Sequence, residues 1–291
     1  MSIGMTGAGW VAGVVGAPVA HSLSPAIHNA WIEESQLDAA YVPFAPPPAG
    51  FAAFIQGMRG GAIRGVNVTI PFKEEALDLA DEASDLARRA GAANLLLFRE
   101  DGAIVAHNTD GEGMLSAMVH QAEFKPQDGP AVILGAGGAA RGAAAALLEA
   151  GAPAVRVINR TRDRAQVLAR QLGGRIEAFG REDALQALRD CACVINATSL
   201  GLGGGPGPDI DLEAAPHQAV VMDMVYKPLE TGFLQRAKAR GMRTVDGLEM
   251  LIRQAIPSFE AFFGRPPPAT INIRLLALEA LALQEAPSNE E

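Results

Sequence analysis

Apolar and polar positions alternate along residues 65–73, GVNVTIPFK. Asn67 and Thr69 fall on one side of this alternation and aliphatic residues on the other, which is the period-two pattern of a β-strand. Pro71 has no backbone N–H to give to a sheet and therefore ends the strand. Lys73 follows at the corner between this strand and a predicted helix, a place where α/β proteins carry functional side chains.

The first third of the chain repeats this alternation of short apolar runs and helical stretches. The pattern predicts, in order, a strand at 11–16, a helix at 24–37, a strand at 39–45, a helix at 50–58, the strand described above, a helix at 73–91 and a hairpin at 92–110. Ser24 is expected to cap the first helix, with Pro25 at the first helical position. This part of the chain is predicted to be an α/β unit with its own sheet.

A second α/β unit is predicted to begin at Ala131. Residues 131–173 read as strand, glycine-rich turn, helix, strand and helix, which is the size of a βαβα unit. The runs ACVINATS and AVVMDMVY predict two more strands, and two amphipathic stretches at 243–264 and 271–286 predict the last helices. We therefore expect an α/β fold with two sheets.

Composition narrows the class of protein. Apolar residues make up 49% of the 291 residues and aromatic residues only 5%, so the core must consist of Ala, Val, Leu and Ile, as in helices packed on a parallel sheet. The formal net charge of −9 disfavours nucleic-acid or membrane-surface binding. The sequence has no long uncharged apolar stretch and no basic, signal-like start, which favours a cytoplasmic protein.

The cysteines and histidines do not indicate a metal site. Cys191 and Cys193 lie in a predicted buried strand and are interpreted as small core residues. The five histidines have no spacing typical of metal ligands. We therefore predict no metal.

The turn GAGGAA, residues 135–140, follows the strand AVIL and precedes an alanine-rich helix, which is the setting of a dinucleotide-binding turn. Gly135 permits the tight turn, and Gly137 lets the backbone approach a pyrophosphate. The N–H groups at the start of the helix would face the phosphates. The predicted phosphate-binding residues are Gly135, Ala136, Gly137, Gly138 and Ala139.

The end of the next strand indicates which dinucleotide binds. NAD enzymes commonly place an acidic residue there against the ribose 2′-hydroxyl, whereas this strand is followed by Asn159, Arg160 and Thr161, with Arg164 one turn later. The two arginines could clamp a 2′-phosphate with forked donors, or they could simply be solvated charges at a helix start. We predict NADP as the cofactor.

Several separate stretches together resemble one family, the shikimate dehydrogenases, which include quinate dehydrogenases and shikimate dehydrogenase-like paralogues. These stretches are HSLSP, GVNVTIPFK, GAAN, NTDGEG, GAGGAAR, NRT, NATSLG, YKP and DGLEMLIRQA, and they run from about residue 11 to 265. The resemblance implies an N-terminal α/β substrate domain, a Rossmann-type NADP-binding domain and C-terminal helices that return to the first domain. Its boundaries imply a substrate domain at 1–110, completed by 248–291, and a dinucleotide domain at 111–247.

The resemblance also implies the reaction and its residues. Family members reduce 3-dehydroshikimate reversibly to shikimate with NADPH. Lys73 matches the family's catalytic lysine and Asp110 its partner, and a lysine near a ketone can exchange the required proton. The residues that match substrate contacts are Ser22, Ser24, Asn67, Thr69, Asn94, Tyr226 and Gln254. Those that match the nicotinamide end of the cofactor site are Thr198, Met224, Gly247 and Met250.

The resemblance leaves the substrate open. Family members usually have valine and threonine around Asn94, where this chain has Ala93 and Leu95. A paralogue acting on quinate or on aminoshikimate is therefore an alternative, and a non-catalytic dinucleotide-binding regulator is disfavoured because Lys73 and Asp110 are both present. We expect a small-molecule substrate, no nucleic-acid or membrane partner, and a monomer or homodimer.

Overall fold

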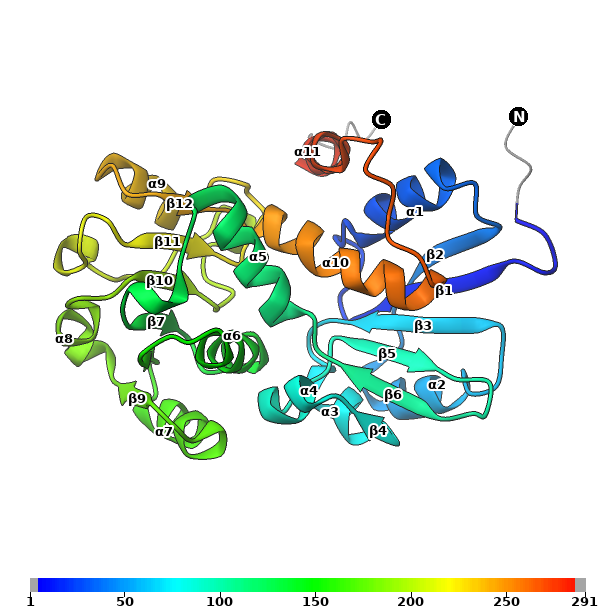
Figure 1. Cartoon of the computed structure of the whole chain (residues 1–291), viewed down its shortest axis with the longest axis horizontal. Helices are drawn as coiled ribbons and strands as arrows, with labels where there is room; N and C mark the ends of the chain where they lie inside the picture. The colour runs from blue at the N-terminus through cyan, green and yellow to red at the C-terminus, as the bar shows by residue number, and fades with distance from the viewer. Residues whose placement is uncertain (1–4, 286–291) are drawn as a thin grey trace. The chain divides into compact units, whose positions relative to one another are not determined.

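The computed structural model describes residues 5–285 of the chain (Figure 1). Two compact units divide the chain between them. The first contains the chain up to Ala87, Ala92–Thr109 and the chain from Ala255 onward; the second contains Arg88–Gly91 and Asp110–Gln254. Each unit holds one six-stranded sheet, and each is described below by itself.

The sheet of the first unit is mixed, with the strand order β2-β1-β3-β5-β6-β4. β1 is parallel to β2 and β3, and β6 is parallel to β4, whereas β5 is antiparallel to both of its neighbours. The predicted hairpin is therefore present as β5 and β6. The strands are β1 Trp10–Val15, β2 Ala39–Phe44, β3 Ile63–Val68, β4 Glu82–Ala83, β5 Leu95–Phe98 and β6 Ile104–His107.

Helices cover both faces of this sheet. On one face, aliphatic residues of β3 pack with α2, and Phe51 stacks on Phe72 with ring centroids 4.3 Å apart. On the other face, Tyr41 of β2 joins an aromatic cluster with Trp31 of α1 and Phe259 of α10. The helices that contribute to this unit are α1 Ser24–Glu34, α2 Phe51–Gln56, α3 Lys73–Asp78, α11 Ile273–Glu285 and, from Ala255, α10 Gly247–Phe263, with a 3₁₀ turn at Pro48–Gly50.

The single helix predicted for residues 73–91 is wrong. The structure has two short helices, α3 Lys73–Asp78 and α4 Asp85–Ala90, with β4 between them. Asp81 holds the chain away from the helical path, because its carboxylate accepts from the Ile104 backbone N–H at 2.8 Å and from Arg59 at 2.6 Å. Pairing of β4 with β6 supplies ladder hydrogen bonds that a continuous helix would lose.

The sheet of the second unit is entirely parallel, with the order β12-β11-β10-β7-β8-β9. Counted from β7 this is the doubly wound order of a dinucleotide-binding sheet, whose direction of winding reverses between β7 and β10. The strands are β7 Ala131–Leu134, β8 Val155–Ile158, β9 Ile176–Phe179, β10 Cys193–Asn196, β11 Val220–Asp223 and β12 Thr244–Val245. The predicted α/β class with a Rossmann-type domain is confirmed.

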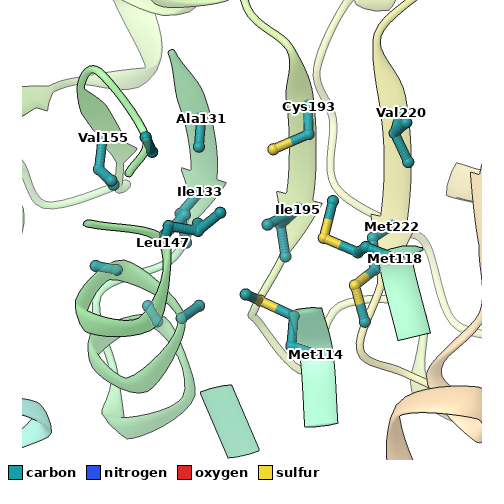
Figure 2. Packing of buried hydrophobic residues seen from close by; sticks show 14 of the residues in the cluster. Met114, Met118, Ala131, Ile133, Leu147, Val155, Cys193, Ile195, Val220 and Met222 are labelled. Atoms are coloured by element: carbon teal, nitrogen blue, oxygen red, sulfur yellow. The ribbon is translucent and has the colours of Figure 1, made fainter. Parts of the chain in front are cut away.

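Alternate residues of these strands face helices on opposite sides. Figure 2 shows one side, where Met114 and Met118 of α5 extend toward Ile195 and Met222 of the sheet. The other side packs against α8 and α9 through residues such as Phe233. The helices are α5 Asp110–Ala122, α6 Gly138–Glu149, α7 Arg162–Leu172, α8 Ala184–Leu188 and α9 Gly232–Ala239, with 3₁₀ turns at Pro126–Asp128, Arg181–Asp183, Leu202–Gly204 and Leu212–Ala214.

The two cysteines are core residues, as predicted. Both are buried and neither forms a disulfide; Cys193 lies in the packed layer of Figure 2. Burial raises the pKa of the Cys191 thiol to about 12 and raises that of Cys193 further. Both side chains are therefore neutral at physiological pH. In the part of the chain that the structure describes, no helix is long and apolar enough to cross a membrane.

Candidate active site

In the first unit, predicted site residues gather at the carboxyl ends of β1 and β3. Thr69 follows β3 and donates its backbone N–H to the Val15 carbonyl at the end of β1, at 2.9 Å. Lys73 is the first residue of α3, and its carbonyl accepts from the Ala93 N–H at 2.8 Å. The turn that carries Lys73 is thereby tied to the segment that carries Asn94, so the structure brings these residues together.

Asn94 is buried and held by the end of β6. Its side-chain oxygen accepts from the Thr109 N–H at 2.7 Å, and its side-chain nitrogen donates to the Thr109 hydroxyl at 2.9 Å. Its backbone carbonyl also accepts from Val68 at 2.8 Å. Thr109, which sequence reasoning missed, therefore fixes the orientation of the Asn94 amide. The motif NTDG contained this threonine, but its role depends on a partner 15 residues away.

Asn67 is 6% exposed, so the polar face predicted for β3 is buried rather than solvated. Its side-chain oxygen accepts from the Tyr41 hydroxyl at 2.8 Å, and its nitrogen donates to the Ser258 hydroxyl at 2.9 Å and to the Asn94 carbonyl at 3.2 Å. These three bonds leave the Asn67 amide one orientation, because a carbonyl oxygen can only accept. Tyr41 and Ser258 were not predicted as site residues.

Ser24 does not cap its helix, contrary to the prediction. It is the first helical residue, Leu23 occupies the cap position, and no side-chain cap bond forms. Leu23 already has helical backbone angles, φ −84° and ψ −9°, and the Ser22 hydroxyl accepts from the Ser24 backbone N–H at 3.3 Å. The helix therefore begins one residue earlier than predicted, and both serines lie at its start.

His28 lies behind this network and is fully buried. Its ring stacks on Tyr41 with centroids 4.1 Å apart and planes 5° apart. Burial lowers the pKa of His28 to about 3, and neither ring nitrogen has a hydrogen-bond partner among the described residues. His28 is therefore a neutral ring that fixes the plane of Tyr41.

The second unit carries the other predicted catalytic and substrate residues. Asp110 is the first residue of α5 and is 7% exposed. Gly113 lies three residues later, on the same face of the helix, and a Cβ there would come within 2.6 Å of Gln254 Cβ. Close approach of α5 and α10 therefore places Gln254 beside the helical face that carries Asp110. Tyr226 is half-buried after β11.

The glycine-rich turn after β7 fits a pyrophosphate. Gly135 has φ +105°, and a Cβ there would lie 2.8 Å from Thr198 Cγ2, so only glycine fits. A Cβ on Gly137 would meet nothing within 4 Å, so this side of the turn is open. α6 begins at Gly138 without a side-chain cap, which leaves its first N–H groups for a ligand. Ala136 and Ala139 lie in the same turn.

The end of β8 fits the adenosine phosphate of NADP. Asn159 follows this strand, and its side chain donates to the Thr161 carbonyl at 2.8 Å, which shapes the corner. Arg160 and Arg164 are exposed, and within residues 5–285 neither forms an ion pair with protein, whereas Arg162 between them pairs with Asp183 at 3.1 Å. The guanidinium groups of Arg160 and Arg164 could therefore bind an anion, such as the 2′-phosphate of NADP, at this end of β8.

Polar residues also end β10 and β11, the two strands on the other side of β7. Asn196 ends β10, and its side-chain oxygen accepts from the Thr198 hydroxyl at 2.6 Å and from the Thr198 N–H at 3.1 Å. Asp223 ends β11 and accepts from the Asn196 amide at 2.8 Å. Both residues are fully buried, and neither was predicted as a site residue. The sequence signal that could have indicated them is one polar residue at the end of an otherwise apolar strand.

The remaining predicted nicotinamide contacts lie near this network. The Met224 N–H donates to the Asn196 carbonyl at 3.0 Å. A Cβ on Gly247 would come within 2.5 Å of the Met224 carbonyl, so the start of α10 lies against Met224. Met250 is one turn further along α10 and is buried in the core of this unit. In the described residues, no group of three or more His, Cys, Asp or Glu side chains could hold a metal ion.

Comparison with protein families gives three matches along the chain. Residues 14–96 match the shikimate dehydrogenase substrate binding domain, residues 118–201 match the shikimate / quinate 5-dehydrogenase family, and residues 247–271 match the shikimate 5'-dehydrogenase C-terminal domain. Together these segments cover more than half of the sequence.

Curated relatives and solved structures agree with these matches. A protein of Caulobacter vibrioides named shikimate dehydrogenase (NADP(+)) is 62% identical over 97% of this chain and 99% of its own length. A crystal structure of shikimate 5-dehydrogenase from Thermus thermophilus, in complex with NADP(H) and shikimate, has a TM-score of 0.84 at 38% identity and covers 93% of this chain and 99% of that one.

A quinate dehydrogenase from Corynebacterium glutamicum in complex with NAD has the same fold, with a TM-score of 0.85 at 27% identity, covering 93% of this chain and 99% of that one. The fold is therefore shared with a relative named for another substrate and bound to NAD. The sequence identity to that relative, 27%, is lower than the 62% and 38% identity to the two shikimate dehydrogenases. The resemblance predicted from the sequence motifs is confirmed. The chain belongs to the shikimate dehydrogenase family.

Proposed function

We propose that this protein catalyses the reversible reduction of 3-dehydroshikimate to shikimate with NADPH. The observation that carries the proposal is the pair of ligand sites: a buried polar sheet end with Lys73 in the first unit, and a glycine-rich turn with two uncommitted arginines in the second. A relative that is 62% identical over nearly the whole chain is named shikimate dehydrogenase (NADP(+)). Charge, burial and strand-end geometry all suit a small polyhydroxylated anion and a phosphorylated dinucleotide.

The residues of the first unit bind the substrate and move its proton. Ser22 and Ser24 hold the carboxylate at the start of α1, where helix N–H groups favour an anion. Lys73 donates a proton to the ketone oxygen during reduction and takes it back during oxidation. Asn67, Thr69 and Asn94 bind the ring hydroxyls. The second unit supplies the other proposed catalytic residue, Asp110, and the further substrate-binding residues Tyr226 and Gln254.

The residues of the second unit bind NADP, which supplies or accepts the hydride when bound. The backbone of 135–139 holds the pyrophosphate, and Arg160 and Arg164 hold the 2′-phosphate with Asn159 and Thr161. Thr198, Met224, Gly247 and Met250 line the nicotinamide end. The positive φ of Gly135 and the open side of Gly137 support this assignment.

One observation favours a second candidate substrate. Leu95 lies directly opposite Asn67 in the β3–β5 pair, so its side chain is on the same face of the sheet. An apolar group beside Asn67, where family members usually have threonine, changes what Asn67 can bind. Quinate and aminoshikimate are therefore the alternative substrates.

The test is a substrate panel on the purified enzyme. Shikimate, quinate and aminoshikimate are each assayed with NADP and with NAD by the absorbance of the reduced nicotinamide. We expect kcat/KM to be highest for shikimate with NADP, by at least about tenfold over the other five combinations. A higher value for quinate or aminoshikimate would replace the proposed substrate, and a higher value with NAD would replace the cofactor.

The location, oligomeric state and partners of the enzyme are also part of the proposal. We propose a cytoplasmic enzyme, a monomer or homodimer, with no nucleic-acid or membrane partner. The net charge of −9 supports the absence of a nucleic-acid partner, because such proteins need a basic surface. Light scattering of the purified protein distinguishes monomer from dimer.

A further inference from the structure

Asp223 is a buried carboxylate that has no role in the proposed reaction. It is fully buried at the end of β11, and burial raises its pKa while hydrogen bonds from Thr231, Val225 and Asn196 oppose that rise. Its Oδ1 accepts from the Asn196 amide at 2.8 Å and from the Val225 N–H at 3.0 Å, and its Oδ2 accepts from the Thr231 hydroxyl at 2.6 Å. Burying a carboxylate away from water costs free energy, so a carboxylate kept at this position is expected to have a role.

The bond to Asn196 fixes which way the Asn196 amide points. The side-chain nitrogen of Asn196 donates to Asp223 and to the Leu200 carbonyl at 3.1 Å, and both of these groups accept. The side-chain oxygen of Asn196 must therefore face the other way, toward Thr198, whose hydroxyl and N–H both donate to it. Without Asp223, one of the two acceptors that fix the amide nitrogen is lost.

The amide of Asn196 in turn shapes the segment after β10. It bridges both sides of the turn by accepting from Thr198 and donating to Leu200, and the Leu200 N–H donates to the Thr198 hydroxyl at 3.2 Å. Thr198 then packs against the phosphate turn, because a Cβ on Gly135 would lie 2.8 Å from its Cγ2. A chain of direct contacts thus runs from Asp223 through Asn196 and Thr198 to Gly135.

Asp223 also fixes the segment after its own strand. Its bond from the Val225 N–H and the bond from the Met224 N–H to the Asn196 carbonyl hold the backbone that carries Met224. The adjacent ends of β10 and β11 are thereby joined by one carboxylate, and β10 borders the point next to β7 where the sheet reverses its winding. Dinucleotides bind doubly wound sheets at this point.

We propose that Asp223 is a positioning residue for the dinucleotide site: it orients the Asn196 amide, which sets the place of Thr198 at the nicotinamide end. The inference rests on the proposed function, because it takes Thr198 and Met224 as cofactor contacts. Asp223 itself touches neither substrate nor cofactor. Its contribution is expected in NADP affinity, and much less in the affinity for shikimate.

The test measures NADP binding to the enzyme without substrate, by isothermal titration calorimetry. We expect Asp223→Ala to raise the Kd for NADP by about tenfold, because one orienting hydrogen bond from a charged group is worth about that factor. Asp223→Asn keeps an oxygen for Asn196 and Val225, and its new amide N–H can donate to the Thr231 hydroxyl. It is expected to restore the Kd to within about threefold of wild type.

A matched control separates positioning from general stabilisation. Thr231→Val removes one of the other two hydrogen bonds of the same carboxylate and the cap of α9, but leaves the Asn196 bond in place. We expect this variant to lower the thermal midpoint of unfolding while its Kd for NADP stays within about twofold of wild type. Asn196→Ala should raise the Kd as Asp223→Ala does, and the double variant should be no worse than either one, because both act through one contact chain.

The possible results distinguish failure of the proposed cofactor from failure of the positioning role. A wild-type enzyme that does not bind NADP would overturn the proposed cofactor itself. A wild-type enzyme that binds NADP, together with an Asp223→Ala variant of equal Kd, would overturn the positioning role alone. Equal loss of affinity in Thr231→Val and Asp223→Ala would assign the effect to loss of stability and would also overturn it.

Discussion

The two ligand sites are built by different means. In the first unit, side chains from β2, β3 and α10 meet in a hydrogen-bond chain through Tyr41, Asn67 and Ser258. In the second unit, the turn after β7 offers backbone N–H groups and glycines, and side chains act mainly behind it. A ring with several hydroxyls needs donors and acceptors at fixed points, whereas a pyrophosphate is held by a row of equivalent N–H groups.

This difference decides what a substitution does in each unit. A side-chain site loses affinity when a hydroxyl or amide is removed or turned. A backbone site loses affinity when a side chain is added, because the ligand's own path is then filled.

The largest effect is expected at Lys73, the group of the first unit that exchanges a proton. Lys73→Ala should lower kcat by at least about 10²-fold, the size of a general acid–base contribution. The thermal midpoint should change little, because the side chain is half-buried at the start of a short helix. Steady-state kinetics of shikimate oxidation check this. Wild-type turnover in the purified variant would remove Lys73 from the mechanism.

Acid sensitivity is expected from the first unit, where His28 is buried and neutral. Its folded pKa of about 3 lies below the ordinary value of 6.5, so the unfolded chain binds the proton first as the pH falls. The free energy of unfolding therefore falls as the pH is lowered from 6.5 to about 3. His28 contributes at most about 1.4 kcal/mol per pH unit to this fall. His28→Phe keeps a ring against Tyr41 and should flatten the fall of the unfolding midpoint between these values. An unchanged slope would assign the acid sensitivity to other groups.

In the second unit, adding one methyl group should separate ligand binding from stability. Gly137 has ordinary extended backbone angles and open space around it, so Gly137→Ala should leave the thermal midpoint of the free enzyme unchanged or slightly higher. The Kd for NADP should rise by at least about tenfold, because the methyl group fills the approach of the pyrophosphate. Gly135→Ala is the contrasting variant and should lower the midpoint itself, since φ is +105° and Thr198 is in the way. Unaltered NADP binding by Gly137→Ala would place the pyrophosphate elsewhere.

Cofactor choice should respond to charge at the end of β8. Arg160→Asp replaces a forked cation by a repelling anion, and we expect the ratio of kcat/KM with NADP to that with NAD to fall by about tenfold or more. Arg162→Ala is the matched control, because its side chain is already paired with Asp183 and should not affect the ratio. If only the control changed the ratio, the roles of these arginines would be reversed. If neither did, Arg164 would be the group to replace next.

The sequence was most informative where the chemistry is local. The turn 135–140 has its glycines, strand and helix within one short stretch, and the strand–turn–helix arrangement predicted for it is present. The partners of Asn67 lie 26 and 191 residues away, so no local pattern could indicate Tyr41 or Ser258. The capping role predicted for Ser24 failed because the helix begins one residue earlier, with Leu23 at the cap position.

The prediction of one long helix at 73–91 was wrong because helical propensity does not include pairing with the edge of a sheet. Asp81 and the pairing of β4 with β6 are tertiary interactions, and they outweigh the helical preference of the segment. Asn196 and Asp223 were missed although both end apolar strands, because a polar residue at a strand end can have many roles. Their role becomes visible only in the hydrogen bond between them.

The smallest effect is expected from Tyr41→Phe, which deletes one hydroxyl behind the site of the first unit. The ring still stacks on His28, so the fold should persist, but the side-chain oxygen of Asn67 loses its donor. We expect the KM for shikimate to rise by about fivefold, less than the full cost of a buried unpaired oxygen because water can enter, with the KM for NADP unchanged. Phe262→Leu is the control, because it disturbs the same aromatic cluster without touching the hydrogen-bond chain and should lower only the thermal midpoint. A rise in the KM for shikimate of equal size in both variants would mean that packing, and not the hydroxyl of Tyr41, holds Asn67 in place.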